Sequence, residues 1–207
     1  KKQCHVALLQ EVPADGLPNI PGYDLLHDKG SRVAAYVTSD VDYQTTTKLC
    51  HSSRALEIQE MRLQVSTGLR HLDVVNVYRD QSLNESEDKL MELLHCIESR
   101  RHAIGQSATF VGGDVNVRCN SFGHPGTVAL LPQSLATDLD AFCDNTDGLV
   151  VMNDGSPTFR PLRVLQTSTD PGQSQVRPLT AIDASLLFLP KGGPPGIFAP
   201  GEWNAKL

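Results

Sequence analysis

Residues 108–116 read ATFVGGDVN, an apolar run that leads through two glycines into alternating polar and apolar side chains. The run is short and contains β-branched and aromatic residues, which predicts a buried strand. Asp114 and Asn116 lie two positions apart, so an extended backbone would present both side chains on one side. A carboxylate acceptor beside an amide donor can orient a water molecule and hold a phosphate oxygen. The stretch is therefore compatible with a catalytic site at the end of a strand.

The glycines of this stretch support two interpretations. They allow the backbone to turn tightly and leave room for a ligand to approach. Gly, Asp and Asn are also the commonest turn residues, and on spacing alone an ordinary turn is the simpler interpretation. The other segments of the chain are needed to distinguish a site from a turn.

Strands are predicted on both sides of this stretch, at 6–10, 32–37, 56–65, 72–78, 148–152, 158–159 and 181–189. The alternation of residues 56–65 shifts near Gln59 and Glu60, which predicts an irregularity in that strand. Residues 68–71 form a turn that would pair it with the next strand.

Two helices are predicted between the strands. Asn84 and Glu87 fit a capping box at the start of the first helix. Its apolar face comprises Leu90, Leu93, Leu94 and Ile97. The second helix covers 133–143, and its inward residues are Leu135, Leu139 and Phe142. Because strands dominate and neighbours join through turns, the pattern favours two packed mixed sheets with helices outside over a doubly wound parallel sheet.

Composition and charge exclude few classes of protein. The chain is 40% hydrophobic with a net charge of −6, which suits an enzyme of small molecules or a nuclease whose acidic groups gather at a metal centre. Its five cysteines contain no CxxC pair, so we expect reduced, buried thiols in an intracellular protein rather than a zinc knuckle. No apolar run approaches the roughly 20 residues of a membrane span.

Three other strand ends carry polar side chains. Glu11 ends an apolar strand, where a carboxylate is costly unless it is solvated, paired or bound to a metal such as Mg²⁺. Tyr78 and Arg79 end another strand and can contact phosphate, although an amphipathic Tyr and a surface Arg are common without any such role. Asp183 lies among apolar neighbours, and it fits either a brace for a histidine or a bond to the backbone.

The order of these segments resembles the endonuclease/exonuclease/phosphatase superfamily. Within it, the chain looks most like the apurinic-type endonuclease domain of non-LTR (LINE-like) retrotransposons. The matching segments are ALLQE at 7–11, VNVYR at 75–79, GGDVN at 112–116, LVVMNDGSPTF at 149–159 and AID at 181–183. The NDGSPTF stretch favours retrotransposons over repair enzymes or phosphatases.

The resemblance implies an α/β fold, a four-layer, DNase I-like sandwich of two packed mixed β-sheets flanked by helices. Glu11 would bind Mg²⁺, or Mn²⁺ in its place, and Asp114 would orient or deprotonate the attacking water. Asn116 and Tyr78 would bind the scissile phosphate, with Arg79 and Thr158 nearby. Asp183 would brace a catalytic histidine.

The implied reaction is in-line hydrolysis of a phosphodiester in double-stranded DNA, leaving a 3′-hydroxyl. In such elements this end primes reverse transcription, so the implied partners are DNA and a reverse transcriptase domain in the same polypeptide. The implied location is nuclear, with no membrane.

The chain departs from the family's pattern at both ends. It contains neither the first strand with its Asn nor the last strand with Ser-Asp-His, and no histidine follows His124. We therefore expect residues 1–207 to be a single domain truncated at both ends. Two alternatives stay open: a related hydrolase (an apurinic-site repair endonuclease or a phosphoinositide phosphatase) and a degenerate retroelement fragment without turnover.

Overall fold

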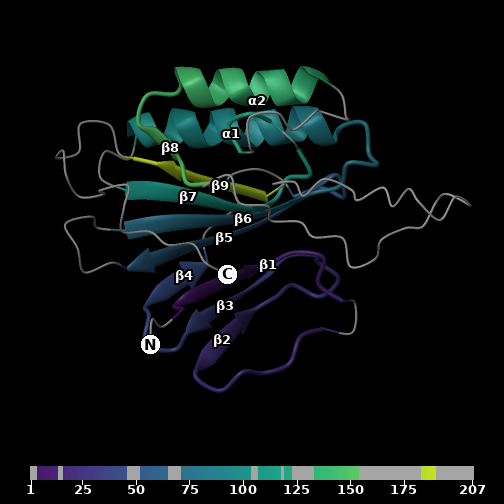
Figure 1. The fold of residues 1–207 in the computed structure, drawn as a ribbon. Coiled ribbons are helices and arrows are strands. Elements are labelled where there is room, and N and C mark those ends of the chain that lie inside the picture. Colours follow the sequence, from purple (N-terminus) through teal and green to yellow (C-terminus); the bar gives the residue numbers. More distant parts are fainter. Residues whose placement is uncertain are drawn as a thin grey trace, which may run out of the picture.

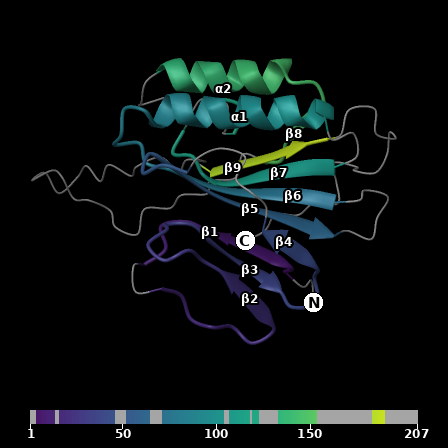
Figure 2. The same cartoon turned by 180° about the vertical axis from the view of Figure 1, so that it is seen from behind.

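Two β-sheets pack face to face in the computed structural model, and two helices cover the outer face of the larger sheet (Figures 1 and 2). The structure describes residues 4–13, 16–45, 52–64, 71–103, 107–117, 119–122, 133–153 and 183–189. The described elements thus form three layers: helices, large sheet and small sheet. This arrangement confirms the predicted class of two packed sheets with helices outside, but the described residues form three of the four predicted layers, because both helices lie on the large sheet.

The small sheet has the order β1-β3-β2, and both of its strand pairs are antiparallel. Its strands are β1 (Val6–Leu9), β2 (Tyr23–Leu26) and β3 (Ala34–Thr38). Every residue of β3 is buried, which explains why its apolar run was visible in the sequence. The strand β2 was not predicted, because its four residues show neither alternation nor an apolar run and it depends on hydrogen bonds to β3.

The large sheet has the order β4-β5-β6-β7-β9-β8. Its strands are β4 (Tyr43–Thr45), β5 (Leu56–Gln64), β6 (His71–Arg79), β7 (Ser107–Asp114), β8 (Leu149–Val151) and β9 (Asp183–Phe188). The pair β6–β7 is parallel and the other pairs are antiparallel, so the sheet is mixed. The helix that follows β6 provides the crossover that a parallel pair requires.

The irregularity predicted near Gln59 and Glu60 is wrong. The pairing of β5 with β6 runs without a break from Leu56 to Gln64. The alternation shifts because both faces of β5 are covered: Leu56 packs in the core beneath the helices and Met61 in the core between the sheets. A strand buried on both faces has no reason to alternate.

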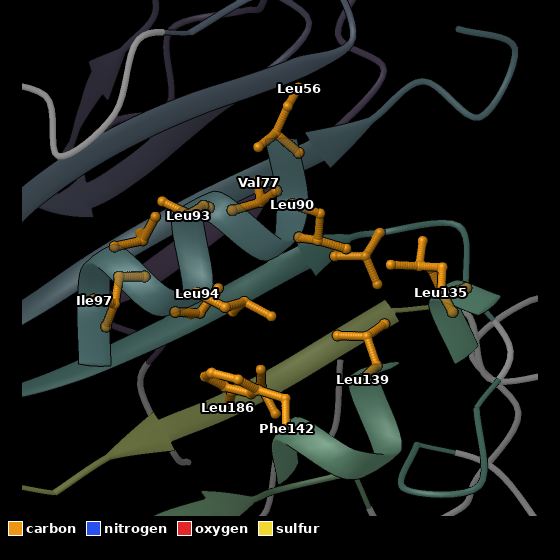
Figure 3. Close-up of a cluster of buried hydrophobic side chains, with 14 of the residues drawn as sticks. Leu56, Val77, Leu90, Leu93, Leu94, Ile97, Leu135, Leu139, Phe142 and Leu186 are labelled. Atoms are coloured by element: carbon orange, nitrogen blue, oxygen red, sulfur yellow. The ribbon is translucent and has the colours of Figure 1, made fainter. Parts of the chain in front are cut away.

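The helices are α1 (Ser86–Ala103) and α2 (Gln133–Asn145). The helix α1 begins two residues after the predicted cap Asn84. The predicted inward residues of both helices are confirmed, since each is at most 6% exposed: Leu90, Leu93, Leu94, Ile97, Leu135, Leu139 and Phe142. Figure 3 shows these side chains meeting Leu56, Val77 and Leu186 of the large sheet. No helix in the described ranges is long and apolar enough to cross a membrane.

A second core joins the two sheets. Its buried residues are Ala35 and Val37 of the small sheet and Met61, Leu63 and Val74 of the large sheet. Beside it lies a buried amide, Asn76 of β6, which is 0% exposed. Its Nδ2 donates to the carbonyl oxygens of Leu9 and Ala34 at 3.2 and 2.9 Å, and its Oδ1 accepts from Gln10 Nε2 at 2.6 Å.

The cysteines correct one expectation. Cys4 is exposed, whereas Cys119 is buried, and Cys96 and Cys143 are half-buried. All four are free thiols, as the absence of paired spacing suggested. The prediction of uniformly buried thiols is therefore wrong for Cys4, which precedes β1 at the start of the described chain.

Candidate active site

Residues from four strands of the large sheet form one row across the sheet. Tyr78 of β6 pairs with Glu57 of β5 and with Asp114 of β7, and Asp114 pairs with Asp183 of β9. Paired residues on neighbouring strands occupy the same face. The side chains of Glu57 and Tyr78 meet Arg32 and Glu11, which flank strands of the small sheet. Sheet pairing therefore brings Tyr78, Asp114 and Asp183 to one edge from distant parts of the chain; Asp183 is located by its backbone position.

Glu11 enters this site from the small sheet. It follows β1 and is exposed, and Tyr78 Oη donates to its Oε1 at 3.1 Å. Glu11 has a φ of 54°, and Asn116 (φ 51°) is the one other non-glycine residue of the described chain with a positive φ. Such backbone is costly for residues other than glycine and clusters at functional sites. Both outliers are residues that the sequence placed in the site.

Tyr78 is buried against a cation. The guanidinium of Arg32 lies 4.5 Å from the centroid of its ring, a cation–π distance. Burial raises the pKa of Tyr78 to about 12, and the hydrogen bond to Glu11 acts in the same direction. At neutral pH the phenol is therefore protonated, and it can donate to a carboxylate or a phosphate oxygen.

Arg32 joins the loop that carries Glu11 to the strands of the large sheet. Its Nε donates to Glu57 Oε1 at 2.5 Å and its Nη1 to Asp80 Oδ2 at 2.8 Å. Its carbonyl oxygen accepts from Val12 N at 3.0 Å. Sequence reasoning missed Arg32 and Glu57, because neither lies in a motif and their partners are distant in the chain.

Asp114 and Asn116 lie side by side at the end of β7. Asn116 N donates to Asp114 Oδ1 at 2.9 Å, and Asn116 Nδ2 donates to the carbonyl oxygen of Arg79 at 2.9 Å. Both residues are half-buried. The carboxylate and the amide that the sequence singled out are thus held together at the rim of the sheet.

Arg79 does not lie where a phosphate contact would place it. Its side chain points to the helix side of the sheet, and the residue is 4% exposed. Its Nε donates to Val115 O at 2.6 Å, its Nη1 to Ser86 Oγ at 2.9 Å and its Nη2 to Asn116 O at 2.9 Å. With all three nitrogens bonded to protein acceptors, the geometry argues against the predicted role of Arg79 in substrate binding.

In the part of the chain that the structure describes, few oxygen ligands for a divalent metal lie close together. Within the described ranges, no three His, Cys, Asp or Glu side chains gather so that they could hold an ion. Mg²⁺ commonly takes one or two carboxylates and keeps several waters. The exposed carboxylate of Glu11 fits such a site as a hard oxygen ligand, and it is the residue to which the resemblance gave this role.

One predicted site residue, Thr158, lies outside the described residues, as does the NDGSPTF stretch beyond Asn153. Asn153 itself accepts from Ser185 N through its Oδ1 at 2.9 Å, which ties the end of β8 to β9. A cavity of about 370 Å³ lies at the opposite end of β5, β6 and β7, and its lining contains none of the predicted site residues.

No family model matches the chain, and no curated protein matches it. Solved structures share its fold. D. rerio TDP2 in a form humanized by 14 mutations superposes with a TM-score of 0.57 at 15% identity, covering 92% of this chain and 72% of that one. The same protein complexed with single strand DNA product gives a TM-score of 0.52 at 15% identity, covering 92% and 73%.

Two further solved structures share this fold. The Xenopus laevis APE2 catalytic domain gives a TM-score of 0.52 at 18% identity, covering 89% of this chain and 74% of that one. The AP endonuclease LMAP from Leishmania major gives 0.53 at 12% identity, covering 88% and 69%. These neighbours are members of the endonuclease/exonuclease/phosphatase superfamily. At such identities the likeness establishes the fold, and it confirms the predicted DNase I-like class.

Proposed function

We propose that this chain is a divalent-metal-dependent phosphodiesterase of the endonuclease/exonuclease/phosphatase superfamily that cuts DNA. The observation that carries the proposal is the convergence of Glu11, Tyr78, Asp114, Asn116 and Asp183 on one edge of the sandwich. These five polar residues come from four segments of the chain, sheet pairing places the backbone of Asp183 beside Asp114, and Glu11 and Asn116 adopt left-handed backbone. Packing alone does not require such a set.

Each residue has a task that its chemistry supports. Asp114 orients the attacking water and accepts its proton. Tyr78 and Asn116 donate hydrogen bonds to the phosphate oxygens. Glu11 would hold a Mg²⁺ ion, which would supply positive charge to the phosphate. Water adds to phosphorus, the bond from phosphorus to O3′ breaks and O3′ takes a proton from solvent, so the products carry a 3′-hydroxyl and a 5′-phosphate.

The biological setting that we propose is target-site nicking by a non-LTR retrotransposon, in which the 3′-hydroxyl primes reverse transcription. Its support is the sequence of the matching segments, and the implied partner is a reverse transcriptase domain. A second candidate is an endonuclease acting at apurinic sites. The fold shared with an AP endonuclease and with the APE2 catalytic domain favours it as the alternative.

Plasmid nicking tests the activity directly. We expect the chain to convert supercoiled plasmid to open circles with Mg²⁺ and to lose this activity in EDTA. Asp114→Asn removes the proton acceptor and is expected to lower the initial rate about 100-fold or more. Asp138→Asn, which removes the same charge from the exposed side of α2, is the matched control and is expected to stay within about twofold.

The outcomes separate the candidates. Preference for an oligonucleotide with an apurinic site over intact duplex favours the repair enzyme. Release of inorganic phosphate from inositol phosphates without nicking identifies a phosphatase. Absence of metal-dependent turnover on all three substrates contradicts the proposal and favours a chain without catalytic activity.

A further inference from the structure

Arg79 is buried beneath the site. It is the last residue of β6, it follows Tyr78, and its guanidinium points away from the small sheet towards the start of α1. Two of its donors reach consecutive carbonyl oxygens, those of Val115 and Asn116, at 2.6 and 2.9 Å. A buried guanidinium bonded to backbone carbonyls in this way holds that stretch of backbone in one conformation.

Arg79 and Asn116 bond to each other in both directions. Asn116 Nδ2 donates to the carbonyl oxygen of Arg79 at 2.9 Å, so backbone and side chain of each residue bond to the other. Asn116 itself has a φ of 51°. Asn tolerates this conformation better than most residues, but a short loop adopts it only when surrounding bonds require it. Arg79 makes three bonds to this loop: its Nε and Nη2 donate to the carbonyl oxygens of Val115 and Asn116, and its own carbonyl oxygen accepts from Asn116 Nδ2.

We propose that Arg79 is a positioning residue: it holds the Val115–Asn116 backbone so that the carboxylate of Asp114 and the amide of Asn116 face the phosphate together. Its importance for catalysis rests on the proposed function. The third bond, from Nη1 to Ser86 Oγ at 2.9 Å, anchors the guanidinium to the first residue of α1. The loop is thereby tied to the helix as well as to the sheet.

Only arginine can make this set of bonds. Its planar fork presents donors in fixed directions, whereas a lysine ammonium is a single point donor on a flexible stem. Burial lowers the pKa of the Arg79 guanidinium, while the carboxylates of Glu87, Asp114 and Asp80 act to raise it. The neighbouring acidic groups therefore favour a charged side chain inside the protein at this position.

Arg79→Lys and a matched control test the proposal. Arg101→Lys is the control, because Arg101 is also buried at 7% exposure and donates to a backbone carbonyl, that of Asp147, at the far end of α1. Two measurements are made on each folded chain: residue-resolved hydrogen exchange of the backbone amides of residues 114–117, and kcat and KM for plasmid nicking with Mg²⁺.

We expect Arg79→Lys to speed exchange of the Asn116 amide about tenfold or more, since each lost hydrogen bond contributes about 1 kcal/mol. We expect kcat to fall about 100-fold with KM within about threefold, because misplacement by about 1 Å suffices for such a loss. Arg101→Lys should leave both measurements within about twofold. A merely structural effect would instead lower the stability of both variants and leave kcat per folded molecule unchanged.

The results distinguish this proposal from the proposed function. Unchanged exchange in Arg79→Lys overturns the positioning role, whatever the activity. Faster exchange with unchanged kcat overturns its importance for catalysis. Faster exchange in a chain whose parent cuts no DNA supports the loop-holding role and contradicts the proposed function.

Ser86→Ala keeps the test decisive if Arg79→Lys does not fold. It removes one of the three acceptors and retains the guanidinium. We expect exchange at Asn116 to rise about threefold and kcat to fall by a similar factor. No change in either measurement in the folded Ser86→Ala chain overturns the proposal.

Discussion

Gly113 has no room for a side chain. A Cβ atom built there would lie 2.0 Å from Val77 O of the neighbouring strand, and the residue has a φ of 145°. At Gly112 a Cβ atom would lie 2.7 Å from Phe110 Cε1 and 3.1 Å from Leu8 Cδ1. The chain turns only after β7, where Asn116 N donates to Asp114 Oδ1 and Asn116 has a φ of 51°. Both glycines lie within β7, so the turn interpretation of GGDVN is wrong for these two residues. Their role is to let β6 and the small sheet approach β7 closely.

Gly113→Ala should be strongly destabilising, because the new methyl group would overlap a backbone carbonyl that cannot move without disrupting the β6–β7 pair. We expect a loss of about 3 kcal/mol or more in the free energy of unfolding, measured by urea denaturation. Gly30→Ala is the control, since Gly30 also has a positive φ, 83°, but has nothing within 4 Å. It should lose about 1–2 kcal/mol from backbone strain alone. Equal losses would show that close approach does not constrain Gly113.

At the scale of elements, one carboxylate on α2 fastens the segment that follows the site. Asp140 accepts hydrogen bonds from the backbone nitrogens and side chains of Asn120 and Ser121, at 2.7–3.2 Å. Burial acts to raise the pKa of Asp140, but these bonds outweigh it and the pKa is lowered. The anchored segment buries Cys119, and this burial, with the charge of Asp140, raises the pKa of the Cys119 thiol to about 12.

Thiol labelling tests this anchor. At pH 8 the Cys119 thiol should be protonated and shielded, so iodoacetamide should label it far more slowly than the exposed Cys4. Asp140→Ala removes both the anchor and the negative charge, and labelling of Cys119 should accelerate about tenfold or more. Asp138→Ala, two residues away on the exposed side of α2, should leave the rate unchanged. Mass spectrometry of the labelled peptides gives the rates, and equal rates in both variants would contradict the anchoring role.

At the scale of the whole molecule, the relative placement of the two sheets sets the distance between Glu11 and the Tyr78–Asp114–Asp183 row. Apolar packing between the sheets is non-directional. Asn76 adds direction, because its amide bonds only if Leu9, Gln10 and Ala34 lie opposite it. A satisfied buried polar group of this kind specifies one arrangement. Gln10, its partner, precedes Glu11, so the amide also fixes where Glu11 enters the site.

Asn76→Ala should therefore weaken the junction between the sheets. We expect a loss of about 2–4 kcal/mol, because the change leaves carbonyl groups without their partner and opens a small cavity. Asn145→Ala is the control: Asn145 also donates to a carbonyl, that of Ala141 at 2.7 Å, but it is exposed, and its loss should stay below about 1 kcal/mol. Urea denaturation of both variants gives the comparison, and similar midpoints would remove the special role of Asn76.

Local sequence patterns suffice to predict the parts of this protein that depend on neighbours in the chain. The apolar faces of α1 and α2, the buried strands β1, β3, β6 and β7, and the polar residues at strand ends all follow from local periodicity and residue chemistry. Glu11, Tyr78, Asp114 and Asn116 could be selected because a polar residue that ends an apolar strand has a known place at the rim of a sheet. The order of these segments then gave the fold class.

Which strand ends meet depends on the pairing of strands that are distant in the chain. The row from Glu57 to Asp183 exists because β7 pairs in parallel with β6 and antiparallel with β9, and no local pattern encodes those partners. Other features of the site also depend on residues that are distant in sequence. They are the burial of Arg79, the stacking of Arg32 on Tyr78 and the left-handed backbone of Glu11 and Asn116. The physical reason is that hydrogen bonding and burial act through space, whereas periodicity reports only on the local chain.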